Sequence, residues 1–175
     1  VSHLLYYSLI TFIRKDLSEI IRLFRKNNNM QWASTTTNGI MTDSIVEQTE
    51  KICFEDKNKR FVLNFSLDGY EKEHDLIRGT GVYKKVIETI KEVNKIKSKY
   101  TNLQIGIVST MSTINQYVLE QFFDEISHEL EPDVLSLLLV RQSPRDGEYL
   151  KKIDIEAYKK TKRKLDELFI KDKNG

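Results

Sequence analysis

The sequence predicts an α/β fold with a parallel sheet, built from about five βα units. Three observations lead to this prediction. Short apolar runs alternate with amphipathic helical patterns along the whole chain. Most of these runs are apolar on both faces, as parallel strands covered by helices are. Polar residues gather where the runs end. Such alternation implies right-handed crossovers, and both an open doubly wound sheet and a partial (β/α) barrel satisfy it.

The strands are predicted where apolar residues run without a helical period. Each run is bounded by Asn, Asp, Gly or Ser residues, which favour turns. The first run is apolar but has no basic segment before it, so we interpret it as a strand and not as a signal peptide. The predicted strands are Leu4 to Phe12, Gln31 to Thr37, Phe61 to Phe65, Leu103 to Val108 and Val134 to Val140.

The helices are predicted from apolar residues three and four positions apart. Asp16 and Glu19 have the spacing of a capping box, which predicts a helix start. Asn27 to Asn29 predict its end. The apolar face of this first helix is expected to comprise Leu17, Ile20, Ile21 and Phe24, and later helices are expected after Asp43, from Val82 to Tyr100, from Val118 and around Tyr158.

Composition favours one domain over residues 1–175 and excludes several classes of protein. Of the 175 residues, 39% are hydrophobic and 31% charged, which is typical of globular domains. The net charge of +2 indicates no nucleic-acid or membrane partner. No apolar run approaches the roughly 20 residues of a membrane helix, so we expect a cytoplasmic protein. The single cysteine, Cys53, excludes an internal disulfide and is expected to be a buried structural thiol.

Polar side chains follow the predicted strands. They include Asn38, the pair Ser66 and Asp68, Ser109, and Arg141. The carboxyl ends of parallel strands share one edge, so these groups predict a polar small-molecule site. The alternative is helix capping, because Ser, Asn and Asp are common in βα turns. The stretch 69–81, with His74, Asp75 and Arg78, is expected to be a long charged loop that adds to the site.

The ordered motifs resemble the radical S-adenosylmethionine (radical SAM) superfamily. The resemblance covers the chain from about Arg14 to the last helix. It rests on TNG ending one strand, SLDG ending the next, HDLIRG and GVY before a helix, and PRDGEYL from Pro144. It implies a partial (β/α)6 barrel, of which this chain would supply strands two to six. Members of this superfamily bind S-adenosylmethionine on a [4Fe–4S] cluster held by a CxxxCxxC loop, and generate a 5′-deoxyadenosyl radical that abstracts hydrogen from an organic substrate.

The resemblance also assigns roles residue by residue. Ser66 and Asp68 match positions near the ribose and carboxylate of S-adenosylmethionine, and Arg78 matches an arginine that pairs with the carboxylate. The strand holding Ile105 to Ile107, which leads to Ser109, resembles the one packed against the adenine, and the turn after Val140, with Arg141, resembles the segment that holds it. Asn38 lies where the third barrel strand reaches the substrate.

Two parts of the superfamily pattern are absent. The stretch matching Gly-Gly-Glu-Pro reads Ser8-Leu9-Ile10-Thr11, and the cluster cysteines are missing. We therefore expect a fragment of a longer barrel that is inactive alone. The alternative is a truncated or degenerate, non-catalytic binding or assembly module. Without the first barrel strand, the strand Leu4 to Phe12 would lie at an open edge of the sheet. We expect a second copy of the chain or another segment to cover this edge.

Two other functions are disfavoured by the sequence. His74-Asp75 is similar to the His-Asp pair of metal phosphohydrolases, but no further ligands stand at suitable spacing, and we expect no metal bound by this chain. An unrelated α/β barrel that binds a phosphorylated metabolite would need a glycine-rich phosphate loop, which Gln142-Ser143-Pro144 does not supply.

Overall fold

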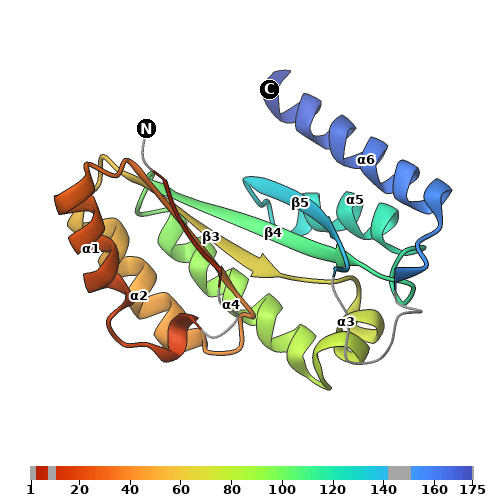
Figure 1. The fold of residues 1–175 in the computed structure, drawn as a ribbon, viewed down its shortest axis with the longest axis horizontal. Helices are drawn as coiled ribbons and strands as arrows, with labels where there is room; N and C mark the ends of the chain where they lie inside the picture. The colour runs from red at the N-terminus through yellow and green to blue at the C-terminus, as the bar shows by residue number, and fades with distance from the viewer. Residues whose placement is uncertain (1–2, 8–10, 142–150, 175) are drawn as a thin grey trace. The chain divides into compact units, whose positions relative to one another are not determined.

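A computed structural model describes residues 3–7, 11–141 and 151–174, and the side chains within 12–141 and 151–168 (Figure 1). The strands form one sheet in the order β1-β2-β3-β4-β5, which confirms the predicted sequential α/β architecture. They are β1 (His3–Tyr7), β2 (Trp32–Thr37), β3 (Arg60–Ser66), β4 (Leu103–Met111) and β5 (Val134–Leu139). The helices are the 3₁₀ helix η1 (Thr11–Ile13) and α1 (Leu17–Asn28), α2 (Thr42–Glu55), α3 (Glu71–Arg78), α4 (Val82–Lys97), α5 (Leu119–Glu129) and α6 (Ile155–Asn174).

The chain divides into two compact units. The first comprises Val1–Ser66 and Lys84–Gly106, and the second comprises Leu67–Tyr83 and Ile107–Gly175. Strand β4 continues from the first unit into the second. The expectation of a single domain stays a prediction. Within the described residues, every helix is too short or too polar to cross a membrane.

The strands of the first unit are parallel and present two different faces. β1 pairs with β2, and β2 pairs with β3 in a register that places Thr35 opposite Leu63. On β2, Thr35 is buried, whereas Ser34 and Thr36 are half-buried. Successive side chains of a strand point to opposite faces, so one face is packed and the other is polar and partly open. The packed face belongs to a core that includes Ala33, Ile45, Ile52, Phe61, Leu63, Phe65 and Val86.

The first strand is shorter than predicted. The sequence suggested a strand from Leu4 to Phe12, but its last two residues belong to η1 (Thr11–Ile13), and β1 is described as His3–Tyr7. Residues 8–10, within the Ser8–Thr11 stretch, lie outside the described residues. Phe12 is buried, and its carbonyl accepts a hydrogen bond of 2.7 Å from the Ser44 hydroxyl at the start of α2. This contact favours a turn of helix over a continued strand.

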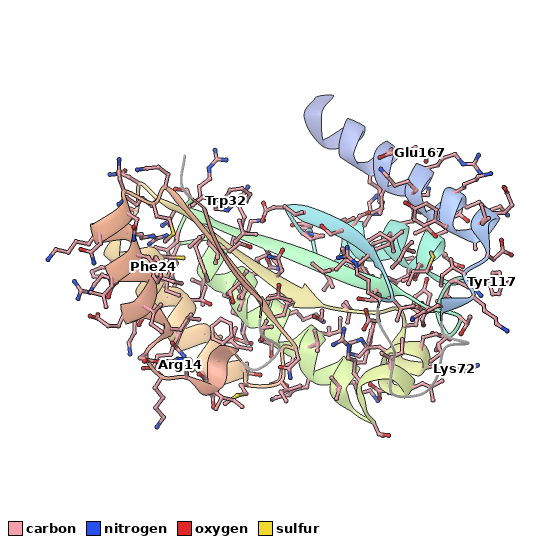
Figure 2. The ribbon with its side chains drawn as sticks, viewed as in Figure 1. Arg14, Phe24, Trp32, Lys72, Tyr117 and Glu167 are labelled. Carbon is pink, nitrogen blue, oxygen red and sulfur yellow. The ribbon has the colours of Figure 1, made fainter. Side chains whose placement is uncertain are left out.

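Helix α1 begins at Leu17 with Asp16 as its N-cap residue, where it was predicted to begin, but its capping contacts and its inner face differ from the prediction. Asp16 makes no capping hydrogen bond and pairs with Arg14, while Glu19 pairs with Arg22, so the predicted capping box is wrong. Phe24, labelled in Figure 2, was expected in the core but is 42% exposed.

Arg25 occupies the inner position that follows Phe24. It is 4% exposed, and its guanidinium donates to the carbonyls of Ile52, Lys59 and Arg60 at 3.0–3.2 Å. Burying a cation is costly unless it is hydrogen-bonded. These carbonyls at the end of α2 and the start of β3 therefore explain why an arginine replaces an apolar residue on the inner face. Figure 1 shows α1 and α2 side by side.

Gly106 on β4 lies under the side chain of Asn64 on β3. A Cβ at position 106 would lie 2.1 Å from Asn64 Oδ1. The Asn64 amide is fixed by its Nδ2, which donates to Ser34 Oγ at 2.9 Å and to the Thr35 carbonyl at 3.3 Å. Position 106 therefore requires glycine because a larger side chain would clash with the Asn64 amide, which its hydrogen bonds hold in place. No turn of the backbone is involved.

Gly106→Ala is expected to lower the free energy of unfolding by about 1–2 kcal/mol, the usual cost of overpacking. Asn64 must leave its hydrogen bonds to make room for the methyl group. In an Asn64→Ala background the same change is expected to be neutral or stabilising, because alanine orders a strand at lower entropic cost than glycine. Chemical denaturation of the four chains of this cycle measures both effects. An equal cost in the two backgrounds would contradict the proposed clash.

The second unit packs α5 against α6. Phe122 and Phe123 on α5 are fully buried, and the Tyr70 ring meets Phe122 edge-on at 5.3 Å. β4 was predicted to end at Val108 but continues to Met111, so Ser109 and Thr110 are strand residues. Thr110 N–H binds Asp68 and the Met111 carbonyl accepts from Val140 N–H, and these bonds extend the strand.

Candidate functional site: the connection between β3 and α3

The polar stretch after β3 is a helix and not the predicted loop. Residues 71–78 form α3, with Glu71 and Glu73 in its first turn and Arg78 in its last. This arrangement of charges suits a helix dipole. Gly69 and Gly79 flank the helix with φ of 124° and 116°, values that side chains other than glycine rarely adopt. The two glycines allow the backbone to turn before and after the intervening residues, which form one short helix.

The helix places His74 and Arg78 on one face, because residues four apart lie one above the other. Both contact Asp68. Arg78 Nε donates to Asp68 Oδ2 at 2.6 Å, and Asp68 N–H donates to His74 Nδ1 at 3.0 Å. Asp68 is fully buried, His74 is fully buried, and the Arg78 side chain is 21% exposed. A short helix thus supplies a cation to the buried carboxylate of Asp68 and a neutral acceptor to its backbone N–H.

The remaining polar atoms of Asp68 are bound by residues from β4 and the turn after it. Thr110 N–H donates to Asp68 Oδ1 at 2.7 Å, and Asn115 Nδ2 donates to the Asp68 carbonyl at 2.8 Å. Asn115 is itself held, since its Oδ1 accepts from Ser112 N–H at 2.7 Å. Both carboxylate oxygens, the N–H and the carbonyl of Asp68 all have partners. We call this group the Asp68 cluster: Asp68, His74, Arg78, Thr110 and Asn115.

Ser109 also contacts this segment, through the backbone. Its hydroxyl donates to the Leu67 carbonyl, and its side chain is fully buried. The Leu67 N–H in turn donates to the Val108 carbonyl at 3.0 Å. These bonds continue the strand pairing up to the residue before Asp68 and fix where the cluster begins.

The tautomer of His74 follows from its contacts. Nδ1 accepts a hydrogen bond, so the proton of the neutral ring is on Nε2. Nε2 is buried and has no hydrogen-bond partner among the described residues. Burial lowers the pKa of His74 below its ordinary 6.5, which the carboxylate of Asp68 opposes and the cation of Arg78 reinforces. The imidazole is therefore neutral near pH 7.

Arg78 uses one side of its guanidinium in the cluster. Nε is bound to Asp68, and the two terminal nitrogens make no hydrogen bond to any residue that the structure describes. The side chain is partly exposed. A guanidinium held in this way can grip a carboxylate with two parallel hydrogen bonds.

The other residues predicted from the sequence are not part of the cluster. Ser66 ends β3 and Asn38 follows β2, and the register that pairs Thr37 with Phe65 makes these two strand ends neighbours in the first unit. Arg141 is exposed and follows β5. It makes no hydrogen bond or ion pair with the cluster among the described residues. Residues 142–150, which include Gln142 and the stretch from Pro144 to Leu150, lie outside the described residues.

Sequence reasoning identified Asp68 and Arg78 but missed two of their partners. Thr110 contributes only a backbone N–H, which no residue pattern reveals. Asn115 stands 47 positions after Asp68 in an ordinary turn sequence. His74 was noted only as a possible metal ligand or a loop residue. The spacing of four residues between His74 and Arg78 would have placed both on one helix face, but a helix was not predicted in this stretch.

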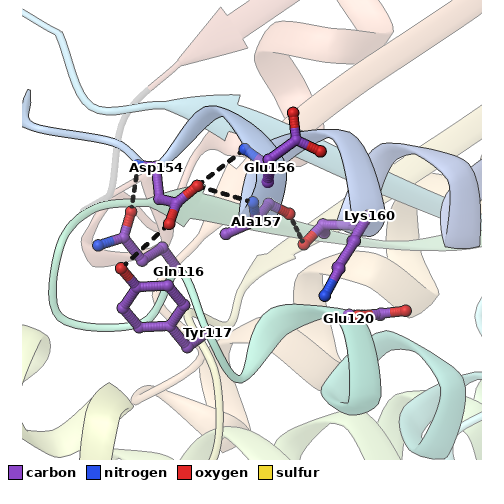
Figure 3. Close-up of a pocket in the computed structure, with 8 residues that line it drawn as sticks. Gln116, Tyr117, Glu120, Asp154, Glu156, Ala157 and Lys160 are labelled. Carbon is purple, nitrogen blue, oxygen red and sulfur yellow. Dashed lines mark hydrogen bonds between the residues drawn. The ribbon is translucent and has the colours of Figure 1, made fainter.

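A separate polar cavity of about 150 Å³ lies where α6 begins, and Figure 3 shows its lining. Asp154 Oδ1 accepts from Glu156 N–H and Ala157 N–H, and these bonds lower the pKa of the Asp154 carboxyl. Gln116 Oε1 accepts from Asp154 N–H at 2.6 Å. Asp154 therefore caps the start of α6, which is the ordinary role of an aspartate at this position.

The residues of this chain do not suit an iron–sulfur cluster. Such a cluster is held by several cysteine thiolates. Cys53 is the one cysteine in the sequence, it is fully buried, and burial raises its thiol pKa to about 12. Among the described residues, no three His, Cys, Asp or Glu side chains lie close enough together to hold a metal ion.

Comparison with known proteins shows the fold. No protein-family model matches the chain, and no curated protein matches its sequence. Solved structures of anSMEcpe, a radical SAM anaerobic sulfatase maturase, do match. The native protein with bound AdoMet, which is S-adenosylmethionine, has a TM-score of 0.66 at 16% identity over 97% of this chain. The complex of AdoMet and the Kp18Cys peptide gives the same values, and the hexahistidine-tagged protein gives 0.62 at 18% identity over 98%.

The chain thus has the fold of part of a radical SAM barrel. It spans about half the length of the matching structures, 47% in each case. The expected α/β partial barrel is confirmed at the level of the fold. The strand pattern in the sequence did not distinguish a doubly wound sheet from a barrel. The match to solved structures favours the barrel.

Proposed function

We propose that the chain supplies the S-adenosylmethionine-binding part of a radical SAM barrel, and that Arg78 binds the methionine carboxylate of the ligand. The observation that supports the proposal is the hydrogen bonding of the Arg78 guanidinium. Its Nε is fixed by a buried carboxylate, and its terminal nitrogens have no partner among the described residues. Solved proteins of the same fold hold AdoMet, which supports this choice of ligand.

The other proposed ligand residues divide by their contacts. Asp68 has all its polar atoms engaged, so we propose that it orients Arg78 and does not touch the ribose. Ser109 is engaged with Leu67 and has the same supporting role. Ser66, whose hydroxyl has no hydrogen bond to a described residue, remains a proposed contact. Arg141 is proposed for the ligand and Asn38 for an organic substrate.

Bound together with a [4Fe–4S] cluster, S-adenosylmethionine supplies 5′-deoxyadenosyl radical chemistry, and the cluster ligands would have to come from outside these 175 residues. The stretch Ser8-Leu9-Ile10-Thr11, which stands in place of Gly-Gly-Glu-Pro, favours a second candidate for this chain alone, a truncated or degenerate non-catalytic binding or assembly module. The first candidate requires binding of S-adenosylmethionine and an assembly module does not, so that binding is the property to test.

The carboxylate contact predicts a ligand preference. The 175-residue chain is expected to bind S-adenosylmethionine on the order of 10-fold more tightly than its decarboxylated analogue, the loss usual for charge-assisted bonds. Arg78→Gln is expected to abolish this preference. Isothermal titration calorimetry with both ligands measures it, and a ratio of two affinities cancels any general loss of folded protein.

Arg22→Gln is the matched control, because Arg22 is an exposed arginine paired with Glu19 on α1. It should leave the preference unchanged. A wild-type chain that binds both ligands equally would remove Arg78 from the site. A chain that binds neither would reject the proposed ligand.

A further inference from the structure

His74 contributes to the Asp68 cluster an acceptor that is present only when its ring is neutral. The Asp68 N–H donates to Nδ1 at 3.0 Å, and both residues are fully buried. A protonated imidazole carries hydrogen on both nitrogens and accepts from neither. Protonation would therefore point two N–H groups at each other inside the protein.

The backbone of Asp68 and its side chain move together, so this contact bears on Arg78. The carboxylate of Asp68 is what fixes Arg78 Nε, at 2.6 Å. His74 and Arg78 are also one turn apart on α3, on the same face. A change at the His74 ring is thus transmitted to the guanidinium by two short routes, through Asp68 and through the helix.

We infer that His74 is a positioning residue that holds Arg78 in place for its ligand only while the imidazole is neutral, so that ligand binding weakens in mild acid. This inference rests on the proposed function. His74 itself touches no ligand in this account, and its effect is exerted through Asp68.

Charged and aromatic groups lie beside the His74 ring. Asp68 and Arg78 oppose each other beside the ring, Asp75 lies on the same helix, and the Tyr83 ring meets His74 edge-on at 6.0 Å. Asp75 accepts from Gly81 N–H and Tyr83 N–H at 2.6 and 2.8 Å, which holds it at the start of α4. Histidine is the ordinary side chain that titrates between about pH 5 and about pH 8.

The direction of the effect follows from burial, which lowers the pKa of His74 below 6.5. The unfolded chain takes up the proton first as the pH falls. The stability that the neutral ring contributes is therefore complete above about pH 6.5 and is lost progressively at lower pH. The wild-type affinity for S-adenosylmethionine is expected to be highest above about pH 6.5 and to fall on the order of 10-fold once the ring is protonated, the loss usual when a charge-assisted contact is weakened.

His74→Asn separates positioning from packing. The asparagine oxygen is bonded to Cγ, as Nδ1 is, and can accept from Asp68 N–H without titrating in this range. The variant is expected to bind with an affinity that does not follow the wild-type fall, and it also reports any pH dependence of the ligand itself. His74→Leu lacks the acceptor and is expected to bind weakly at every pH.

A ligand-independent measurement keeps this inference distinct from the proposed function. The ¹⁵N shifts of the His74 ring in the wild-type chain are expected to show a proton on Nε2 and none on Nδ1 at neutral pH. A ring protonated on Nδ1, or identical pH profiles for wild type and His74→Asn, would overturn the inference. If no variant binds S-adenosylmethionine, the proposed function fails, and the ring shifts together with the pH dependence of unfolding still decide the role of His74.

Discussion

Asp68→Asn is expected to lower the free energy of unfolding by about 3 kcal/mol, the usual cost of removing one partner from a buried ion pair. The carboxylate is fully buried and accepts from Arg78 Nε and from Thr110 N–H. An asparagine can satisfy one of these donors with its oxygen. Its amide group would then face the other donor, and no rotation of the side chain corrects both contacts.

The control for this change is Asp166→Asn, the same substitution in an exposed ion pair with Lys162 on α6. Exposed pairs of this kind contribute about 0.5 kcal/mol or less. Urea denaturation of the two variants and the wild type gives both differences. Similar losses for the two variants would show that the Asp68 cluster is no stronger than a surface pair.

Arg25→Met is expected to lower the free energy of unfolding by about 2–3 kcal/mol, because three carbonyls lose a charged donor. Methionine fills similar space with apolar atoms, so the change tests hydrogen bonding more than volume. The carbonyls of Ile52, Lys59 and Arg60 would be left without this partner. Denaturant unfolding measures the loss.

Two further variants serve as comparisons for Arg25→Met. Arg22→Met, three residues earlier on the exposed side of α1, is expected to change the stability little, because exposed ion pairs contribute little. Arg25→Lys keeps the charge but cannot reach three acceptors at once, so its stability should fall between Arg25→Met and wild type. An Arg25→Lys chain as stable as wild type would show that charge and not geometry matters here.

Much of the fold could be predicted because hydrophobic period is a local property. β2, β3, β5, α2, α4 and α5 were recognised from residues within each element. The errors arose where a polar residue has an internal role. Arg25 reads as a surface residue until the carbonyls 27 to 35 positions later are known. Asp16 and Glu19 fit a capping box, but nearby arginines bind both of them.

The site was harder to predict than the fold. Asp68 and Arg78 were singled out by resemblance, and yet their mutual contact requires α3 to be a helix. The residues from Glu71 to Asp75 are all charged or titratable, so the stretch before Leu76 reads as a solvated loop. The flanking glycines with positive φ define the helix instead. The donors from Thr110 and Asn115 depend on tertiary structure and lie beyond any local pattern.

The residues of the Asp68 cluster are synthesised at different times, because they lie far apart in the sequence. His74 and Arg78 emerge from the ribosome within ten residues of Asp68, so two of its four contacts can form early. Thr110 and Asn115 follow 42 and 47 residues after it. Chains grow at roughly 5–20 residues per second. A nascent chain therefore carries a half-satisfied aspartate for several seconds, and the cluster is completed only after the whole of β4 has been made.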